Sequence, residues 1–190
     1  MAKCFDVVGY VEPCNAVRQK YTGRALLIKD NGEGNKNDIT FSDNGLQVTN
    51  IKSSSTFAAA EFLVLPIIID AENPFGVTVQ GNTDSGRVMY TKTISVSIPA
   101  TRDGKAEEFI MGLQKGLNID AMVVLETIGH TDKNDIFGAY SPLRLDPTSV
   151  TRSEYENGGA WTFNLVCDEP VPNVICTMTG LSEAIDNFDK

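Results

Sequence analysis

The single histidine of the chain stands in a segment that also carries acids. His130 lies in GHTDKND, with Asp132 and Asp135 close to it in sequence. Imidazole and carboxylate groups can bind metal ions or transfer protons, but either role needs further ligands or partners brought close in space. The segment has the polar composition of an exposed turn, which is the more economical explanation. We therefore predict neither a metal site nor a catalytic site at His130.

The four cysteines could supply a nucleophile. Cys4, Cys14, Cys167 and Cys176 are widely spaced and form no C-x-x-C pair. A catalytic thiol needs a base, and His130 is the only imidazole, so its pairing with Cys14 or Cys167 stays open. The chain is too large to depend on disulfides for folding, so we expect reduced and mostly buried thiols instead.

Other polar patterns suggest chemistry only weakly. Glu154 and Glu156 alternate in SEYEN and imitate the carboxylate pair of a glycosidase, although a solvated strand edge explains them equally well. Residues 30–38, DNGEGNKND, lack the alternating acids and late glutamate of an EF-hand. The chain contains no G-x-x-x-x-G-K-[ST], G-x-G-x-x-G or G-x-S-x-G motif. We therefore predict that the protein is not an enzyme and has no cofactor and no metal.

The chain instead carries many extended segments. Alternating apolar and polar residues predict half-buried strands, because successive side chains of a strand point to opposite faces. We expect strands over residues 5–12, 24–30, 39–41, 46–51, 75–79, 88–100, 120–127, 136–140, 141–145, 160–168 and 171–179. Residues 42–45, SDNG, predict a hairpin turn with positive φ at its centre, and residues 81–86 a second turn. Residues 53–62 fit either a short helix or a strand that continues into FLVLPIII.

Two of these strands have a clear apolar face. In residues 88–100, Lys92 is the one polar side chain on a face that otherwise holds Val88, Tyr90, Ile94, Val96 and Ile98. In residues 160–168 one face holds Trp161, Phe163, Leu165 and Cys167. Such faces predict sheets with one side on a core and the other side in water.

One segment has the period of an α-helix. Thr101 or Asp103 can cap it, and Gly116 ends it. Apolar residues recur every three or four positions, at Ala106, Phe109, Ile110, Leu113 and Leu117. The outer side is expected to hold Glu107, Glu108, Gln114 and Lys115.

The totals describe one globular domain over residues 1–190. We expect a mainly β fold, with two packed antiparallel sheets or a barrel and one flanking α-helix. The net charge of -9 argues against a protein that grips nucleic acid through its phosphates. We expect no signal peptide, and the longest apolar run, residues 62–69, is too short to span a bilayer.

The charge is uneven along the chain. Residues 150–190 carry seven acids and two bases, whereas the first 24 residues carry four bases and two acids. Ends of opposite charge could favour head-to-tail association, and a solvated tail is the simpler alternative.

The second half has a recognisable order. It runs through EEFIMGLQKG, AMVVLET, a polar turn, IFGAY and LRLDPTSVTRSEYENGGAWTFNLVCDEP to a last short strand. This order resembles the tail-tube family, which comprises the tube proteins of long-tailed phages and the type VI secretion tube protein. It is similar to the versions in phages and prophages of Bacteroidetes, including ring-like tail proteins of crAss-like phages. The front resembles them too, with Cys14, Gly23, RALLIKD and ITFSDNGLQVTNI.

The resemblance implies a virion structural protein, a tail-tube or tail-ring subunit that self-assembles into a ring. Its partners would be copies of itself and adjacent tail or portal-proximal virion proteins, with DNA only as non-specific cargo through the lumen and no membrane. The protein would be made in the cytoplasm of the host bacterium and end in the virion tail. The candidate inter-subunit contacts are Phe75, Val77, Val79, Arg87, Arg18 and Lys20.

Two other functions remain open at this point. A head decoration protein or another capsid or tail accessory protein would have the same β-rich composition. A secreted or surface carbohydrate-binding module would need exposed aromatic side chains, whereas the only tryptophan, Trp161, is expected in the core.

Overall fold

The computed structural model describes residues 21–29, 38–57, 63–68, 75–84, 86–100, 104–116, 121–129, 132–153 and 159–187. Several predicted features lie outside these residues, namely the strand over 5–12, most of the loop over 30–38, the N-cap candidates Thr101 and Asp103, His130, and the acids of SEYEN. Within the described residues the fold is mainly β, with two packed sheets and a flanking helix, as predicted from the sequence.

The larger sheet has seven strands. Their order is β2 (Ile39–Phe41), β3 (Gln47–Ile51), β11 (Ile175–Cys176), β8 (Asn134–Phe137), β7 (Met122–Thr127), β1 (Tyr21–Lys29) and β4 (Leu63–Ile68). All neighbouring pairs are antiparallel except β3 and β11, which are parallel. The edge strand β4 contains Pro66 opposite Leu26, in agreement with the confinement of proline to sheet edges.

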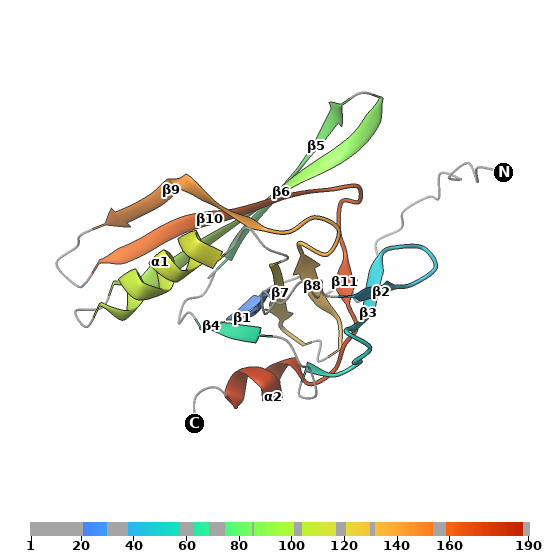
Figure 1. Ribbon diagram of the computed structural model, residues 1–190, viewed down its shortest axis with the longest axis horizontal. Helices are drawn as coiled ribbons and strands as arrows, with labels where there is room; N and C mark the ends of the chain where they lie inside the picture. Colours follow the sequence, from blue (N-terminus) through green and yellow to red (C-terminus); the bar gives the residue numbers. More distant parts are fainter. Residues whose placement is uncertain are drawn as a thin grey trace.

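The smaller sheet has four antiparallel strands. Their order is β5 (Phe75–Asp84), β6 (Arg87–Pro99), β10 (Ala160–Glu169) and β9 (Arg144–Ser153). Helix α1 (Lys105–Gly116) lies along this sheet, and the short helix α2 (Leu181–Asp186), which the sequence did not suggest, lies at the opposite end of the molecule (Figure 1).

The larger sheet is covered on both faces. Leu27 of β1 and Val123 of β7 belong to the core between the sheets, which α1 completes. Their neighbours Leu26 and Val124 belong to a second core, which α2 covers through residues such as Ile185. Burial on both faces explains why these two strands are nearly continuous apolar runs.

The predicted β2–β3 hairpin is confirmed, but Asn44 does not have the positive φ that was predicted at the centre of its turn. Only Gly45 has a positive φ in this turn, 70°. Asn44 contributes through its side chain, whose Oδ1 accepts hydrogen bonds from the Leu46 amide at 3.0 Å and the Ser42 hydroxyl at 2.7 Å. A side-chain bond of this kind stabilises a turn without a left-handed asparagine.

The second predicted turn, over residues 81–86, is wrong for most of its length. Strand β5 continues to Asp84, which pairs with Arg87 across a turn that contains Gly86 at φ 78°. Polar residues fit this strand because its far half is exposed, so strand pairing rather than burial determines its length.

Smaller corrections concern the ends of strands and the face of helix α1 on which one side chain lies. Strand β8 begins at Asn134, so Asn134 and Asp135 are buried strand residues rather than turn residues. Strand β11 covers only Ile175–Cys176 of the predicted 171–179. Residues 53–57 form isolated bridges, and the rest of the ambiguous segment up to 62 lies outside the described residues. Glu107 is half-buried rather than on the outer side of α1, because its Oε1 accepts a hydrogen bond from Trp161 Nε1 at 3.2 Å.

Candidate functional site

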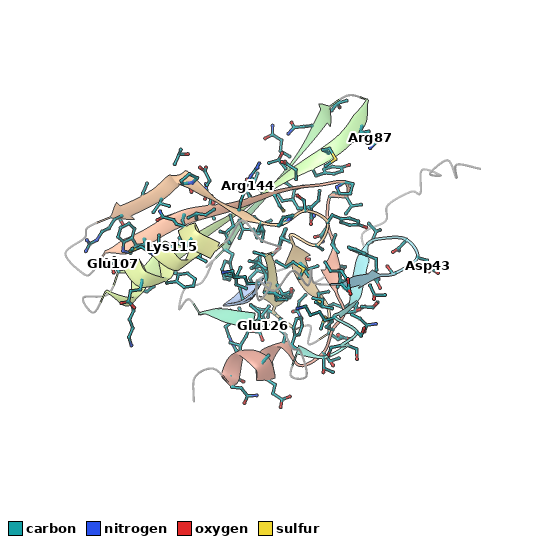
Figure 2. The ribbon with its side chains drawn as sticks, in the orientation of Figure 1. Asp43, Arg87, Glu107, Lys115, Glu126 and Arg144 are labelled. Atoms are coloured by element: carbon teal, nitrogen blue, oxygen red, sulfur yellow. The ribbon has the colours of Figure 1, made fainter. Side chains whose placement is uncertain are left out.

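The predicted inter-subunit contacts divide between the core and the surface. Phe75 is a core residue, 7% exposed, and its ring meets that of Tyr21 edge-on at 6.4 Å. Val77 is half-buried against the same core. Val79 and Arg87 are exposed, and Figure 2 shows Arg87 near the tip of the β5–β6 hairpin. The other two candidates, Arg18 and Lys20, lie outside the described residues.

The β5–β6 hairpin extends beyond the part of the sheet that supports it, because β10 pairs with β6 only as far as Tyr90. Its far end projects beyond the two sheets (Figure 1). The row of side chains that faces the core near Phe75 continues along the hairpin, because every second residue of a strand shares a face. Along this row Val79, opposite Lys92, is 42% exposed, and Val88, which lies beyond the last β6–β10 pair at Tyr90, is 54% exposed.

Tyr90 extends the same row on β6. It is half-buried, and it lies opposite Gly81, where an added Cβ would be 3.5 Å from the tyrosine ring. We call Val79, Val88 and Tyr90 the hairpin strip. This strip is a partly exposed apolar surface that runs from the four-stranded part of the sheet onto the projecting hairpin, and exposed apolar surface can mark contact with another chain.

The strand that carries half of this strip is also a sheet edge. Among the described residues β5 pairs only with β6, and its sequence, FGVTVQGNTD, has one charged residue, Asp84. Edges of soluble sheets are usually protected by charges, prolines or short length, because an open edge can pair with another strand. The opposite edge, β9, is more irregular, with Pro147 within it and a register shift where it meets β10.

A buried ion pair joins two neighbouring strands of the smaller sheet, β6 and β10. The side chains of Lys92 on β6 and Glu169 at the end of β10 are both 0% exposed, and Lys92 Nζ contacts Glu169 Oε2. Glu169 Oε1 accepts hydrogen bonds from the backbone amides of Gly138 and Tyr140, each at 3.1 Å. The apolar ring of Phe137 lies 5.6 Å from Lys92 Nζ.

The loop that follows β8 requires glycine at position 138 because of its backbone geometry. Gly138 has φ 88°, and an added Cβ would lie 2.6 Å from the carbonyl oxygen of Ala121. The close approach lets the amide of Gly138 point at Glu169. The sequence showed Lys92 as a polar side chain on an apolar face, but it did not show its partner. The available signal was that Glu169 continues the buried row of Leu165 and Cys167.

The two described cysteines are buried and reduced, as predicted. Burial, followed by the nearby charge of Glu169, raises the pKa of the Cys167 thiol to about 12. Burial likewise raises the pKa of Cys176 to about 12. Because only the thiolate is a good nucleophile, neither cysteine is suited to catalysis near neutral pH.

One of the acids close to His130 in sequence, Asp135, has structural partners. Asp135 Oδ2 accepts a hydrogen bond from the Tyr21 hydroxyl at 2.7 Å, and its Oδ1 accepts one from Asn173 Nδ2 at 3.2 Å. Burial and the charge of Asp135 raise the pKa of Tyr21. Within the described residues no group of three or more His, Cys, Asp or Glu side chains is placed to hold a metal ion.

A second polar cluster attaches α2 to the larger sheet. Arg24 on β1 binds Asp186 at 2.5 Å and the carbonyl oxygen of Ser182 at 3.1 Å. Glu126 on β7 accepts hydrogen bonds from Thr22 at 2.6 Å and from the hydroxyl of Ser182. Figure 2 shows Glu126 between the sheet and this helix. The cluster therefore fixes the helix that closes the second core.

Comparison of the chain with protein-family models, with curated proteins and with solved structures finds no match. No helix among the described residues is both long enough and apolar enough to cross a bilayer. Among the described residues, the projecting hairpin with its open edge is the surface feature that best defines a candidate site.

Proposed function

We propose that the protein is a structural subunit of a virion tail, of the tube or ring type, which self-assembles into a ring around the DNA conduit. The observation that carries this proposal is the hairpin strip, in which Val79 and Val88 are 42% and 54% exposed along a hairpin whose far end projects from the body. A second copy that covers the strip buries these side chains, which contributes about 1.5–3 kcal/mol for each valine.

The open edge of β5 gives the proposed contact between subunits a direction. A neighbour's strand laid along β5 satisfies its outward amides and carbonyls and continues the four-stranded sheet, and a closed ring removes the free edge altogether. The two edges of this sheet, β5 and β9, differ in sequence, so one subunit can offer β5 to the next in a head-to-tail contact. A head-to-tail contact is the kind that generates rings when the rotation closes.

The negative net charge of the chain suits a subunit that surrounds a DNA conduit. At -9 the chain repels DNA, so cargo can move past without the counterion release that makes basic channels bind it. The resemblance of residues 137–170 and of the front of the chain to the tail-tube family supports the same role. The protein is made in the host cytoplasm and incorporated into the virion tail.

The experiment is sedimentation velocity and negative-stain microscopy of the purified chain. Sixfold or twelvefold rings are expected. The variant Val79→Lys/Val88→Lys should dissociate them, with the dissociation constant rising at least about tenfold for each valine lost from the contact. Met111→Lys is the matched control, because Met111 is a similarly exposed apolar residue, 52%, on α1, away from the hairpin.

Each other outcome has a defined meaning. Threefold assemblies would favour a head decoration protein, the alternative virion component. A strict monomer at high concentration would contradict assembly through this surface. Specific binding on a glycan array would favour the carbohydrate-binding module, although Trp161 is hydrogen-bonded to Glu107 and has the Arg152 guanidinium 5.7 Å from its ring.

A further inference from the structure

The Lys92–Glu169 pair has a geometry that an ordinary ion pair does not require. Lys92 lies directly opposite Cys167 in the β6–β10 register, and Glu169 is two residues farther along the same face of β10. Both side chains are fully excluded from water, and Lys92 Nζ contacts one oxygen of the carboxyl group. An amine and a carboxyl group are thus held in contact in a dry interior.

The two oxygens of Glu169 have different environments. Oε1 accepts two backbone hydrogen bonds, from Gly138 N and Tyr140 N, each at 3.1 Å. Oε2 contacts Lys92 Nζ. Two amides directed at one oxygen form the arrangement that stabilises developing negative charge in acyl-transfer reactions, and the other oxygen is free to leave.

We propose that Lys92 and Glu169 react with each other to form an intramolecular amide bond between β6 and β10. The proposed reaction begins with the transfer of a proton from Nζ to Oε2, which leaves a neutral amine beside a neutral carboxylic acid. The lone pair of Nζ then attacks Cδ, and the negative charge that develops on Oε1 is held by the amides of Gly138 and Tyr140.

The reaction needs no other reactant. A second proton passes from Nζ to Oε2, the Cδ–Oε2 bond breaks, and Oε2 leaves as water. The Cδ–Oε1 double bond re-forms, and Nζ keeps one proton as an amide N–H. Holding the groups in contact replaces a bimolecular encounter, which lowers the barrier to such a condensation.

The surroundings favour the product. Phe137 lies over Nζ at 5.6 Å, and the buried Cys167 stands opposite Lys92, so the site excludes the water that would hydrolyse the bond. Asp168, the acid next in sequence, belongs to the other face of β10, where its Oδ1 accepts a hydrogen bond from Thr91 at 2.6 Å, so it does not compete for Lys92. The product replaces two buried charges with one neutral amide.

The test is intact-mass measurement of the purified full chain, followed by tryptic mapping. Formation of the bond lowers the mass by one water molecule. Trypsin should not cut after Lys92, and residues 88–102 should appear joined to residues 153–190 as one branched peptide. Glu169→Gln should reach the same final mass, because loss of ammonia from glutamine gives the identical amide.

Two lysine variants complete the design. Lys92→Arg keeps the positive charge but lacks a nucleophilic amine, so it should show its full calculated mass. Lys115→Arg replaces an exposed lysine on α1 and should still lose one water. A wild-type chain of full mass, cut after Lys92 and giving two separate peptides, would overturn the proposal. Ring assembly is scored separately, so failure here leaves the proposed function untouched.

Discussion

At the scale of single residues, the main polar feature of the described interior is the buried contact between Lys92 and Glu169. A charge without its partner in a dry core costs several kcal/mol, and Glu169 is held further by two backbone amides. The pair also connects β6 and β10 with the loop after β8, because both amides belong to that loop. The Lys92–Glu169 contact therefore helps to hold the smaller sheet against the loop that follows strand β8 of the larger sheet.

Removing one partner tests this connection. We expect Lys92→Met to lower the free energy of unfolding by at least about 3–5 kcal/mol, because it leaves Glu169 buried without its cation and also removes the proposed amide bond. Adding Glu169→Gln should recover part of this loss, since glutamine keeps an acceptor for Gly138 and Tyr140 without the charge. Urea unfolding of the single and double variants measures both effects. A double variant as unstable as the sum of the single changes would show that the two side chains do not act together.

The buried thiols give a second prediction at this scale. The raised pKa values, about 12 for Cys167 and for Cys176, leave almost no thiolate at pH 8. Alkylation at pH 8 should therefore leave both residues unmodified in the folded protein and modify both in denaturant, where burial no longer raises the pKa. Peptide mapping by mass spectrometry distinguishes them from Cys4 and Cys14. Rapid labelling of Cys167 in the native protein would contradict its position in the core.

At the scale of elements, the sequence predicts the helices and strands that have a clear local period. Strand β6 alternates over its whole length, and α1 repeats its apolar residues every three or four positions, so both were identified. The two-residue strand β11 is too short to show a period. Helix α2 is also short, with six residues, and begins after Gly180 in the left-handed conformation rather than after a side-chain cap.

Such local patterns do not predict which residues far apart in the sequence contact each other. Lys92 and Glu169 are 77 residues apart, and nothing local connects a polar residue on one apolar face with an acid at the end of another strand. The length of β5 was missed for a related reason, since its exposed half is held by pairing with β6 and contains residues typical of turns. The candidate contacts on this strand differ in burial, since Phe75 is 7% exposed and Val79 is 42% exposed.

The contribution of α2 can be measured directly. Ile185 is 0% exposed in the second core, and Ile185→Ala should lower the free energy of unfolding by about 2–5 kcal/mol through lost burial and the cavity left behind. Glu183→Ala, on the exposed side of the same helix, should change it by less than about 0.5 kcal/mol. Thermal and urea unfolding provide the measurement. Equal effects of the two variants would mean that the helix does not complete the core.

At the scale of the whole molecule, two cores share one sheet. The strands β1 and β7 contribute to both, so loss of either core exposes a face of the same strands. The β5–β6 hairpin is the exception, because its far end projects from this body (Figure 1). A rigid body with one projecting apolar arm is suited to joining copies, and the arm rather than the cores is expected to determine how they join.

Salt dependence distinguishes the two ways in which copies could associate. Each subunit carries a net charge of -9, so like charges oppose assembly and salt should screen that repulsion. If the hairpin strip drives the contact, raising NaCl from about 0.05 M to about 0.5 M, which shortens the screening length to a few ångströms, should strengthen self-association severalfold. If instead the basic first 24 residues attract the acidic residues 150–190, the same change should weaken it. Sedimentation velocity across the salt series, with Val79→Lys/Val88→Lys alongside, decides between them, because the variant should remove the association only in the first case.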